Sequence, residues 1–402
     1  MPIRLRERSL AHRVCLAVAW LFVIVPIVYV PFATKLGFIF GSVDKASRIG
    51  QLNTVIAFAV AILGLNIVIG FAGQLALGQS AFIGLGAYTT VILVADHHWS
   101  YLSTLPISAG ICFVAGLLVG VPATRVKGVY LAIMTLVLAF VFPAFVLRFG
   151  WLTGGPNGKG PPRRQGKLFA PSWMPFADTG RLAGPLWIYS LLVVIAAALF
   201  LLARNGMRSR PGRALITMRD HEPSATALGV NVALYKALAF GFSALYGGLA
   251  GSMLMMNRPF AIDVDYGTKM SIFLVAGLVV GGAGAISGAV PSAFVYIFVP
   301  YLLTEWTFDQ SGLPWGIRQI TRPLFVLLEP AGGDASGIFF GVALIVLTLV
   351  LPGGFVSGMR AIRSRLVTID PNPSWRPRPD GSGDPTHAGT THEPVDRTGR
   401  PH

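Results

Sequence analysis

Polar side chains that could bind a solute without carrying charge gather in one glycine-rich apolar segment, residues 64–88. They are the amides and hydroxyls of Asn66, Gln74, Gln79, Ser80 and Tyr88. Such groups both donate and accept hydrogen bonds, so they can hold a polar or zwitterionic solute without a buried charge. Glycine at this density permits a helix break, which is tolerated at membrane depth where it lines a cavity. The segment predicts a substrate pathway; close helix packing through small residues is the alternative.

A second candidate site lies in the polar stretch 204–236. Pro223 suits the first turn of a helix, and Gly229 suits the position just after its end. A helix this short is marginal in water by itself, so we expect it to dock against a partner. The alternative is a solvated basic loop.

The composition restricts the class of protein that carries these residues. Of 402 residues, 53% are hydrophobic and only 12% are charged, against about 25% charged in soluble domains. This excludes a soluble enzyme, a disordered regulator and a fibrous protein. The net charge of +15 is concentrated in short segments between apolar runs, which is typical of a membrane protein rather than of nucleic-acid binding.

The apolar runs predict an all-α fold, a polytopic transmembrane helical bundle of about ten spans (8–10) with Gly-interrupted helices. The spans are expected at Val14–Ala33, Leu52–Phe71, Leu75–Ala95, Leu102–Val121, Val129–Leu147, Leu186–Ala203, Ala237–Met256, Met270–Gly282, Ile286–Leu303 and Ile338–Leu351. The GxxxG pairs are interpreted as helix-packing positions; they are Gly116/Gly120, Gly247/Gly251, Gly277/Gly281 and Gly284/Gly288.

The charges flanking the spans predict orientation. Arginines in the N-terminal arm 1–13 place that arm in the cytoplasm, and an even number of spans returns the C-terminus there. The transmembrane domain then covers 14–360, with 204–236 as a cytoplasmic loop. The tail 361–402 is rich in Pro, Gly and Thr and is predicted to be cytoplasmic and mostly disordered.

None of the predicted spans contains Asp, Glu, Lys, Arg or His. Ion-coupled carriers and membrane-embedded enzymes usually place ionisable groups inside the bilayer, so both classes are disfavoured. The chain also lacks a phosphate-binding loop for a nucleotide. We therefore predict no catalytic residue, no metal site and no bound cofactor, with the energy supplied by another subunit or the transport passive.

Four motifs, in order, resemble one family. They are GLNIVIGFAGQLALGQSAFIGLGAY at 64–88, LTGGPNG at 152–158, GRALITMRDHEPSATALGVNVALYKALAF at 212–240 and LPGG at 351–354. Together they resemble the LivM-like inner-membrane permeases of branched-chain amino acid ABC importers. The resemblance covers about residues 50–360.

The resemblance implies a permease in a bacterial inner membrane that moves an amino acid inward. It implies a second, LivH-like permease, two cytoplasmic ATPase subunits that use ATP, and an external solute-binding protein, with no nucleic acid. It also implies that the 222–229 helix couples to an ATPase. The coupling residues would be Arg213, Arg219, Glu222, Ala225, Ala227, Leu228 and Gly229.

The substrate stays open between branched-chain or other amino acids and urea or short-chain amides, because the family transports both kinds. A self-sufficient secondary carrier is the remaining rival.

Overall fold

The computed structural model describes residues 3–6, 45–126, 128–161, 182–297 and 367–370. The chain divides into two units, a large one at Val25–Ile362 and a small one formed by Met1–Ile24 with Arg363–His402. In the small unit, strand β1 (Ile3–Arg6) pairs in parallel with strand β2 (Val367–Asp370). Neither strand was predicted from the sequence. The rest of the predicted disordered tail lies outside the described residues.

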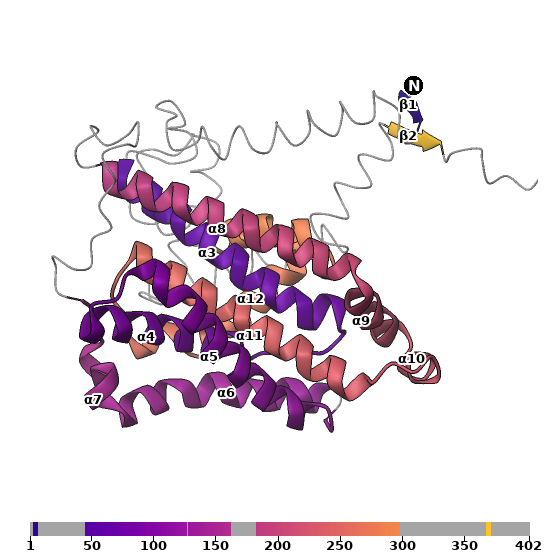
Figure 1. Ribbon diagram of the computed structural model, residues 1–402, viewed down its shortest axis with the longest axis horizontal. Coiled ribbons are helices and arrows are strands. Elements are labelled where there is room, and N and C mark those ends of the chain that lie inside the picture. Colours follow the sequence, from indigo (N-terminus) through magenta and orange to yellow (C-terminus); the bar gives the residue numbers. More distant parts are fainter. Residues whose placement is uncertain (1–2, 7–44, 127, 162–181, 298–366, 371–402) are drawn as a thin grey trace, which may run out of the picture. The chain divides into compact units, whose positions relative to one another are not determined.

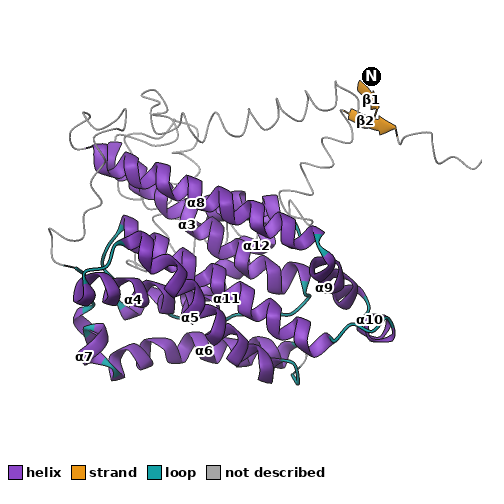
Figure 2. Ribbon diagram, viewed as in Figure 1, coloured by secondary structure: helices purple, strands orange, loops and turns teal. Residues whose placement is uncertain are grey.

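Every described element of the large unit is helical, as predicted (Figure 2). Its elements are α3 (Lys45–Asn66), the π-helix η1 (Ile67–Phe71), α4 (Gln79–His97), α5 (Tyr101–Ala123), α6 (Val129–Arg148), α7 (Gly150–Thr153), η2 (Gly155–Asn157), α8 (Ala183–Arg208), α9 (Arg210–Asp220), α10 (Glu222–Ala227), α11 (Val232–Asn257), η4 (Asp263–Tyr266), α12 (Thr268–Gly281) and η5 (Ile286–Gly288). We call the end that holds α9 and α10 the α10 end, and the opposite end the α7 end (Figure 1).

Six helices in the described ranges are long and apolar enough to cross a membrane. They are Ile49–Phe71, Gln79–His97, Tyr101–Ala123, Val129–Arg148, Ala183–Arg208 and Val232–Asn257. Each coincides with a predicted span, which confirms six of the ten. The predicted spans Val14–Ala33 and Ile338–Leu351 lie outside the described residues.

The predicted eighth span, Met270–Gly282, and the described part of the ninth, Ile286–Ile297, form a bent pair of helices. Helix α12 and the helical stretch Ile286–Ile297 form a pair bent by 119° at a short break. The rings of Phe273 and Tyr296 lie 6.4 Å apart, so the second arm returns alongside the first. We call this pair the α12 hairpin. The glycines at the break interrupt the helix, and the expected count of about ten spans is therefore not confirmed.

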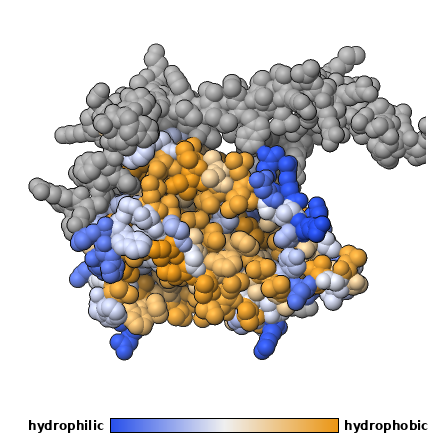
Figure 3. Space-filling model, viewed as in Figure 1, coloured by the Kyte–Doolittle hydropathy of each residue, from blue (hydrophilic) through white to orange (hydrophobic). Residues whose placement is uncertain are grey.

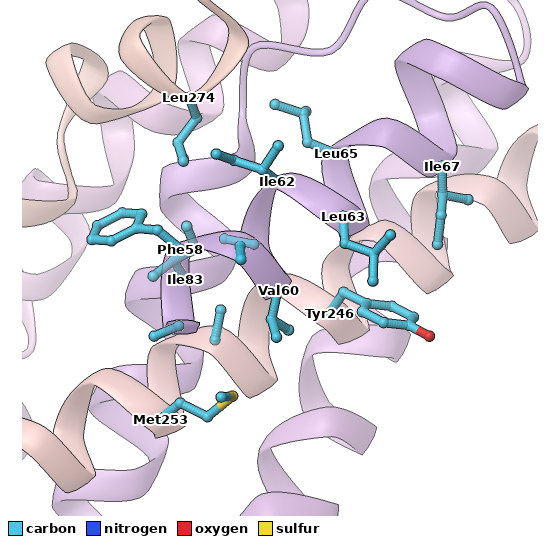
Figure 4. Close-up of a cluster of buried hydrophobic side chains, with 14 of the residues drawn as sticks. Phe58, Val60, Ile62, Leu63, Leu65, Ile67, Ile83, Tyr246, Met253 and Leu274 are labelled. Carbon is cyan, nitrogen blue, oxygen red and sulfur yellow. The ribbon is translucent and has the colours of Figure 1, made fainter. Parts of the chain in front are cut away.

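Helices α3 and α11 form the centre of the large unit. In the most apolar stretch of the α3–η1 helix, 83% of the residues are buried, and in that of α11, 78%. The corresponding share for α5 is 28%. Figure 4 shows the resulting core, with Ile62 and Leu63 of α3 facing residues of α4, α11 and α12. These central helices position both candidate sites.

Small residues allow the central helices to approach closely. A side chain at Gly116 of α5 would lie 2.6 Å from the carbonyl oxygen of Phe240 on α11, and one at Gly251 of α11 would lie 2.0 Å from that of Ile83 on α4. Lipid supplies no hydrophobic drive between helices, so such close packing must hold them together. The interpretation as packing sites is confirmed at Gly116 and Gly251.

The outer helices present apolar side chains to their surroundings. Leu118 on α5, Phe140 on α6 and Val194 on α8 are each about 70% exposed or more. Figure 3 shows apolar residues across the visible body, with hydrophilic residues towards its ends. An apolar surface of this extent suits a protein surrounded by lipid and not one in water.

Candidate functional site

The predicted break in the 64–88 segment is present. Helix α3 widens into the π-helix η1, residues 73–78 form no regular structure, and α4 begins at Gln79. Gly73 has a φ of +67°, which L side chains rarely adopt, and a side chain there would lie 2.5 Å from Cγ of Arg219. Because π-turns are often found at functional sites, we follow each polar residue of this segment in turn.

Asn66 joins the break in α3 to the tip of the α12 hairpin. Its side chain is fully buried, and its Nδ2 donates to the carbonyl oxygen of Ala285 at 2.9 Å. Its Oδ1 accepts from the backbone N–H of Gly284 at 2.8 Å. Both polar atoms of this amide therefore bind the backbone of the hairpin tip. The amide links the interruption at the end of α3 to the interruption in the α12 hairpin.

Gln79 and Ser80 are bound by neighbouring helices. Nε2 of Gln79 donates to the carbonyl oxygens of Ala61 and Ser243 at 3.2 Å each, and its Oε1 accepts from Ser243 Oγ at 3.0 Å. Ser271 Oγ of α12 accepts from the Ser80 N–H at 3.0 Å and donates to Ser80 Oγ at 2.9 Å. These contacts fix α4 against α3, α11 and α12.

Tyr88 and Gln74 have polar atoms without a partner. The Tyr88 ring packs against Phe142 and Tyr266, with centroids 6.3 and 6.0 Å away, yet its buried hydroxyl has no hydrogen-bond partner in the described part of the chain. Gln74 is 6% exposed, and neither its Oε1 nor its Nε2 has a partner there. A buried unsatisfied amide costs about 1–3 kcal/mol, so these two residues are the segment's candidates for contact with a solute.

Gln74 lines a cavity of about 260 Å³ at the α10 end. Arg219, Glu222 and Lys236 also line it. The cavity therefore brings together the two regions that the sequence pointed to, the glycine-rich segment and the polar loop.

The polar loop folds into two helices. The predicted short helix is α10, with Pro223 in its first turn, and Gly229 follows it with a φ of +79°. Ala225 is fully buried, while Leu228 is 76% exposed. Arg213, Ala227 and Gly229 are exposed as well. The eleven-residue helix α9, which precedes α10, was not anticipated.

Arg219 of α9 connects this loop to the broken helix. Its Nη1 donates to the carbonyl oxygen of Gly70, inside η1, at 2.8 Å, and its Nε donates to Asp220 at 2.9 Å. A π-helix leaves its carbonyls less regularly paired, so a guanidinium that holds one of them fixes the local backbone.

Glu222 ties α10 to the start of α11. Its Oε1 lies 2.9 Å from Nζ of Lys236, whose side chain is only 10% exposed. Sequence reasoning missed Lys236 and Ser271. Lys236 has a local sequence signal, because it lies one residue before an apolar run. The contact of Ser271 depends on which helices pack together.

A larger cavity of about 470 Å³ lies at the α7 end, where α3, α11 and the α12 hairpin meet. Among its lining residues are the charged Arg258, Asp265 and Lys269, with Phe58 and Phe273 as apolar walls. Burial raises the pKa of the Asp265 carboxyl, which lies outside the spans, and nearby Arg258 opposes that shift. Sequence reasoning did not single out these residues.

The predicted LTGGPNG turn closes the α7 end. Helices α7 and η2 form the turn, and Thr153 Oγ1 donates to the carbonyl oxygen of Val146 at 2.7 Å. The following Lys159 forms an ion pair with Asp96 of α4 at 2.6 Å, and its backbone pairs with that of Ala261. The motif is therefore a structural anchor between α4, α6 and the segment before η4.

Comparisons with known proteins agree with these features. The high-affinity branched-chain amino acid transport system permease protein LivM of Salmonella typhimurium is 29% identical over 324 residues, covering 74% of each chain. LivM of Escherichia coli is 30% identical over 302 residues, covering 68% of this chain and 70% of the relative. No solved structure matches. The family described as the permease component of the branched-chain amino acid transport system matches residues 47–348. With six apolar helices of membrane-spanning length and a match over most of its length, the chain belongs to this family of transport permeases.

Proposed function

We propose that the chain is the permease subunit of an ATP-binding-cassette importer that moves amino acids, branched-chain ones above all, inward across a bacterial inner membrane. Separate ATPase subunits hydrolyse ATP, and this chain binds no cofactor. Membership of the permease family supports the transport role. The finer features of the proposal depend on the contacts of the α10 end.

The observation that carries the proposal is the bond between Arg219 and Gly70. Through it, the loop that bears α10 holds the carbonyl of a broken membrane helix. Asn66 in turn joins that helix to the hairpin tip at Gly284. A push on α10 would therefore reach α9 through the backbone, and then two helix interruptions through the bonds of Arg219 and Asn66, which is what coupling to an ATPase requires.

The surface of α10 suits docking to an ATPase. Leu228 exposes 76% of its area at the end of a six-residue helix, and a side chain at Gly229 would meet no atom within 4 Å. Burying such a leucine contributes about 1.5–3 kcal/mol. We propose that one ATPase subunit covers this surface, and that a LivH-like second permease, a second ATPase and an external solute-binding protein complete the importer.

This assembly places the α10 end in the cytoplasm, together with both chain termini. The α12 hairpin starts at the α7 end, and Tyr296 in its second arm packs against Phe273 near the start of the first, at 6.4 Å. A re-entrant hairpin adds no crossing. The six described spans and the two predicted spans outside the described residues then give an even total. The termini then remain on one side.

The proposed pathway runs between the two cavities. The cavity at the α7 end offers Arg258, Asp265 and Lys269 to a solute delivered from outside. Tyr88, with its unpartnered hydroxyl, packs against Tyr266 in the wall of that cavity. Asn66, Gln79 and Ser80 were predicted to line the pathway; we propose that they act through the walls that their hydrogen bonds hold in place.

The coupling is tested with Gly229→Glu in the complete complex reconstituted in liposomes. Glutamate resists a φ of +79° and adds a charge on the docking surface, at a backbone cost of about 1 kcal/mol. We expect assembly to persist while substrate-stimulated ATP hydrolysis and uptake of labelled leucine both fall about tenfold. Solute binding by the external protein should not change.

Two variants serve as controls. Gly206→Glu adds the same charge at the end of α8, where a side chain also meets no atom within 4 Å but φ is helical, and it should retain activity. Gly229→Asn introduces a residue that tolerates the left-handed region, so it should lose less ATPase stimulation and uptake than Gly229→Glu. Full stimulation and uptake in the Gly229→Glu complex would show that the loop is only a solvated connector.

A urea or short-amide importer is the second candidate, because the unpartnered groups of the 64–88 segment, on Gln74 and Tyr88, are uncharged. Uptake of labelled urea and acetamide beside labelled leucine separates the two. A self-sufficient secondary carrier is tested by the same complex without ATP, in which we expect no uptake against a gradient.

A further inference from the structure

The cavity beside Gln74 is a candidate site for a ligand of its own. We propose that it binds one free amino-acid zwitterion at the α10 end, an inference that rests on the proposed amino-acid transport and names a site within it. The zwitterion would leave the protein from here.

The first argument is the unsatisfied amide. Gln74 is 6% exposed, lines the cavity, and has no partner in the described residues for Oε1 or for Nε2. Buried polar groups in native proteins are nearly always hydrogen-bonded, and each exception needs an explanation such as a bound group, a water or strain. Gln79, in the same segment, has partners for both atoms, so the difference is a property of this position.

The second argument is the charge around the cavity. Lys236 and Glu222 form an ion pair across 2.9 Å at its wall, and Lys236 Nζ uses one donor on the carboxylate. An ammonium has three donors, so Lys236 can also reach a solute carboxylate. Glu222 accepts from a solute ammonium, while the Gln74 amide can bond to either end. The second cation of the lining, Arg219, is already engaged by Asp220 and by the carbonyl oxygen of Gly70. The Lys236 ammonium, the Glu222 carboxylate and the Gln74 amide then match a zwitterion, which carries both charges.

The third argument is size and lining. A volume of about 260 Å³ lies just below the ~300 Å³ at which small-molecule pockets begin. The remaining walls include Leu75, Val126, Leu131 and Met218. This apolar part suits a short aliphatic side chain, while the polar part suits the groups shared by all amino acids.

Binding is measured without the external protein, since the site is proposed at the opposite end. The complete complex of permeases and ATPases in lipid nanodiscs, free of nucleotide, is equilibrated with radiolabelled leucine. We expect saturable binding that Gln74→Met weakens about tenfold, the loss typical of a hydrogen bond to a charged group. The matched control is Gln51→Met, because Gln51 also has a buried Oε1 without a partner among the described residues but lines neither cavity.

Two further arms define the ligand class. Isovaleramide, isovalerate and leucinamide each lack one or both charges of leucine and should compete at least tenfold less well. Lys236→Met should weaken leucine binding without changing that of isovaleramide, which provides a second variant if Gln74→Met assembles poorly. Equal competition by isovaleramide would overturn the zwitterion assignment in favour of a neutral amide.

The inference and the proposed function fail in different ways. If the complex, supplied with binding protein and ATP, takes up leucine but shows no saturable binding in nanodiscs, or if Gln74→Met binds leucine as tightly as the unmodified chain, the site is wrong and the function stands. If the complex takes up no amino acid under any condition, the proposed function itself is wrong.

Discussion

Gln79 and Gln74 lie close together in the sequence and are both almost fully buried, yet their surroundings differ. Around Gln79 three helices meet, and its amide makes three hydrogen bonds, at 3.0–3.2 Å. Around Gln74 the chain is irregular, a cavity of about 260 Å³ opens, and the amide makes none in the described residues. A satisfied amide strengthens the fold, whereas an unsatisfied one weakens it. The difference therefore separates a packing position from the position at which we propose binding.

The largest effect that follows from this comparison is on folding. Gln79→Leu removes three hydrogen bonds and leaves Ser243 Oγ without its acceptor, so we expect the free energy of unfolding to fall by about 2–4 kcal/mol. Thermal unfolding of the purified complex measures this. Gln74→Leu should unfold at the same temperature as the unmodified protein or higher. Equal destabilisation by both variants would remove the distinction.

The next effect concerns the link between the two regions of the α10 end. Arg219→Leu removes the bond to Gly70 and the pair with Asp220, so we expect substrate-stimulated ATP hydrolysis to fall about tenfold, with a loss of stability of about 1 kcal/mol. Arg210→Leu, at the exposed start of α9, is the control. Unchanged stimulation of ATP hydrolysis in Arg219→Leu would show that the bond between Arg219 and η1 does not contribute to coupling.

A smaller effect is expected where α4 meets the α12 hairpin. Ser271→Ala leaves the N–H and hydroxyl of Ser80 without their partner, which should cost about 1 kcal/mol of stability. Because Ser80 belongs to the packed region, the rate of uptake per folded complex should stay unchanged. A lower rate at equal stability would move Ser80 from the packed region to the pathway.

The smallest effect concerns Tyr88, which combines features of both regions. Its ring is packed, but its hydroxyl has no partner in the described part of the chain. Tyr88→Phe keeps the ring, so we expect unchanged stability. Leucine uptake should fall about threefold, which corresponds to about half the free energy of a typical hydrogen bond. An unchanged rate of leucine uptake would show that Tyr88, like Gln79, is a packing position.

Much of the fold could be predicted because hydropathy is a local property. The six spans between Ile49 and Asn257 follow from apolar runs longer than a bilayer core. The same rule did not reveal the 119° bend between Thr268–Gly281 and Ile286–Ile297, because length and hydropathy do not give the direction of a helix after a break. The predicted count of about ten spans is therefore not confirmed.

The candidate site was predicted only in part. The residue types and the glycine density identified the 64–88 segment, and the Pro and Gly positions identified α10. Which amides would be satisfied could not be predicted, because Ser243, Ala61 and Ala285 reach them from distant parts of the chain. Lys236 entered the site for the same reason, through its pair with Glu222.

The sequence by itself determined that this is a membrane protein, where most of its spans lie, and that a short helix ends just before Gly229. These features depend on composition and on backbone preferences within a few residues. Only the tertiary structure decided that Arg219 holds the carbonyl of Gly70, that Asn66 holds the hairpin tip, and that Gln74 faces a cavity. Each of these depends on which helices pack together, and in lipid that is decided by close contacts between small residues and by buried hydrogen bonds rather than by hydropathy.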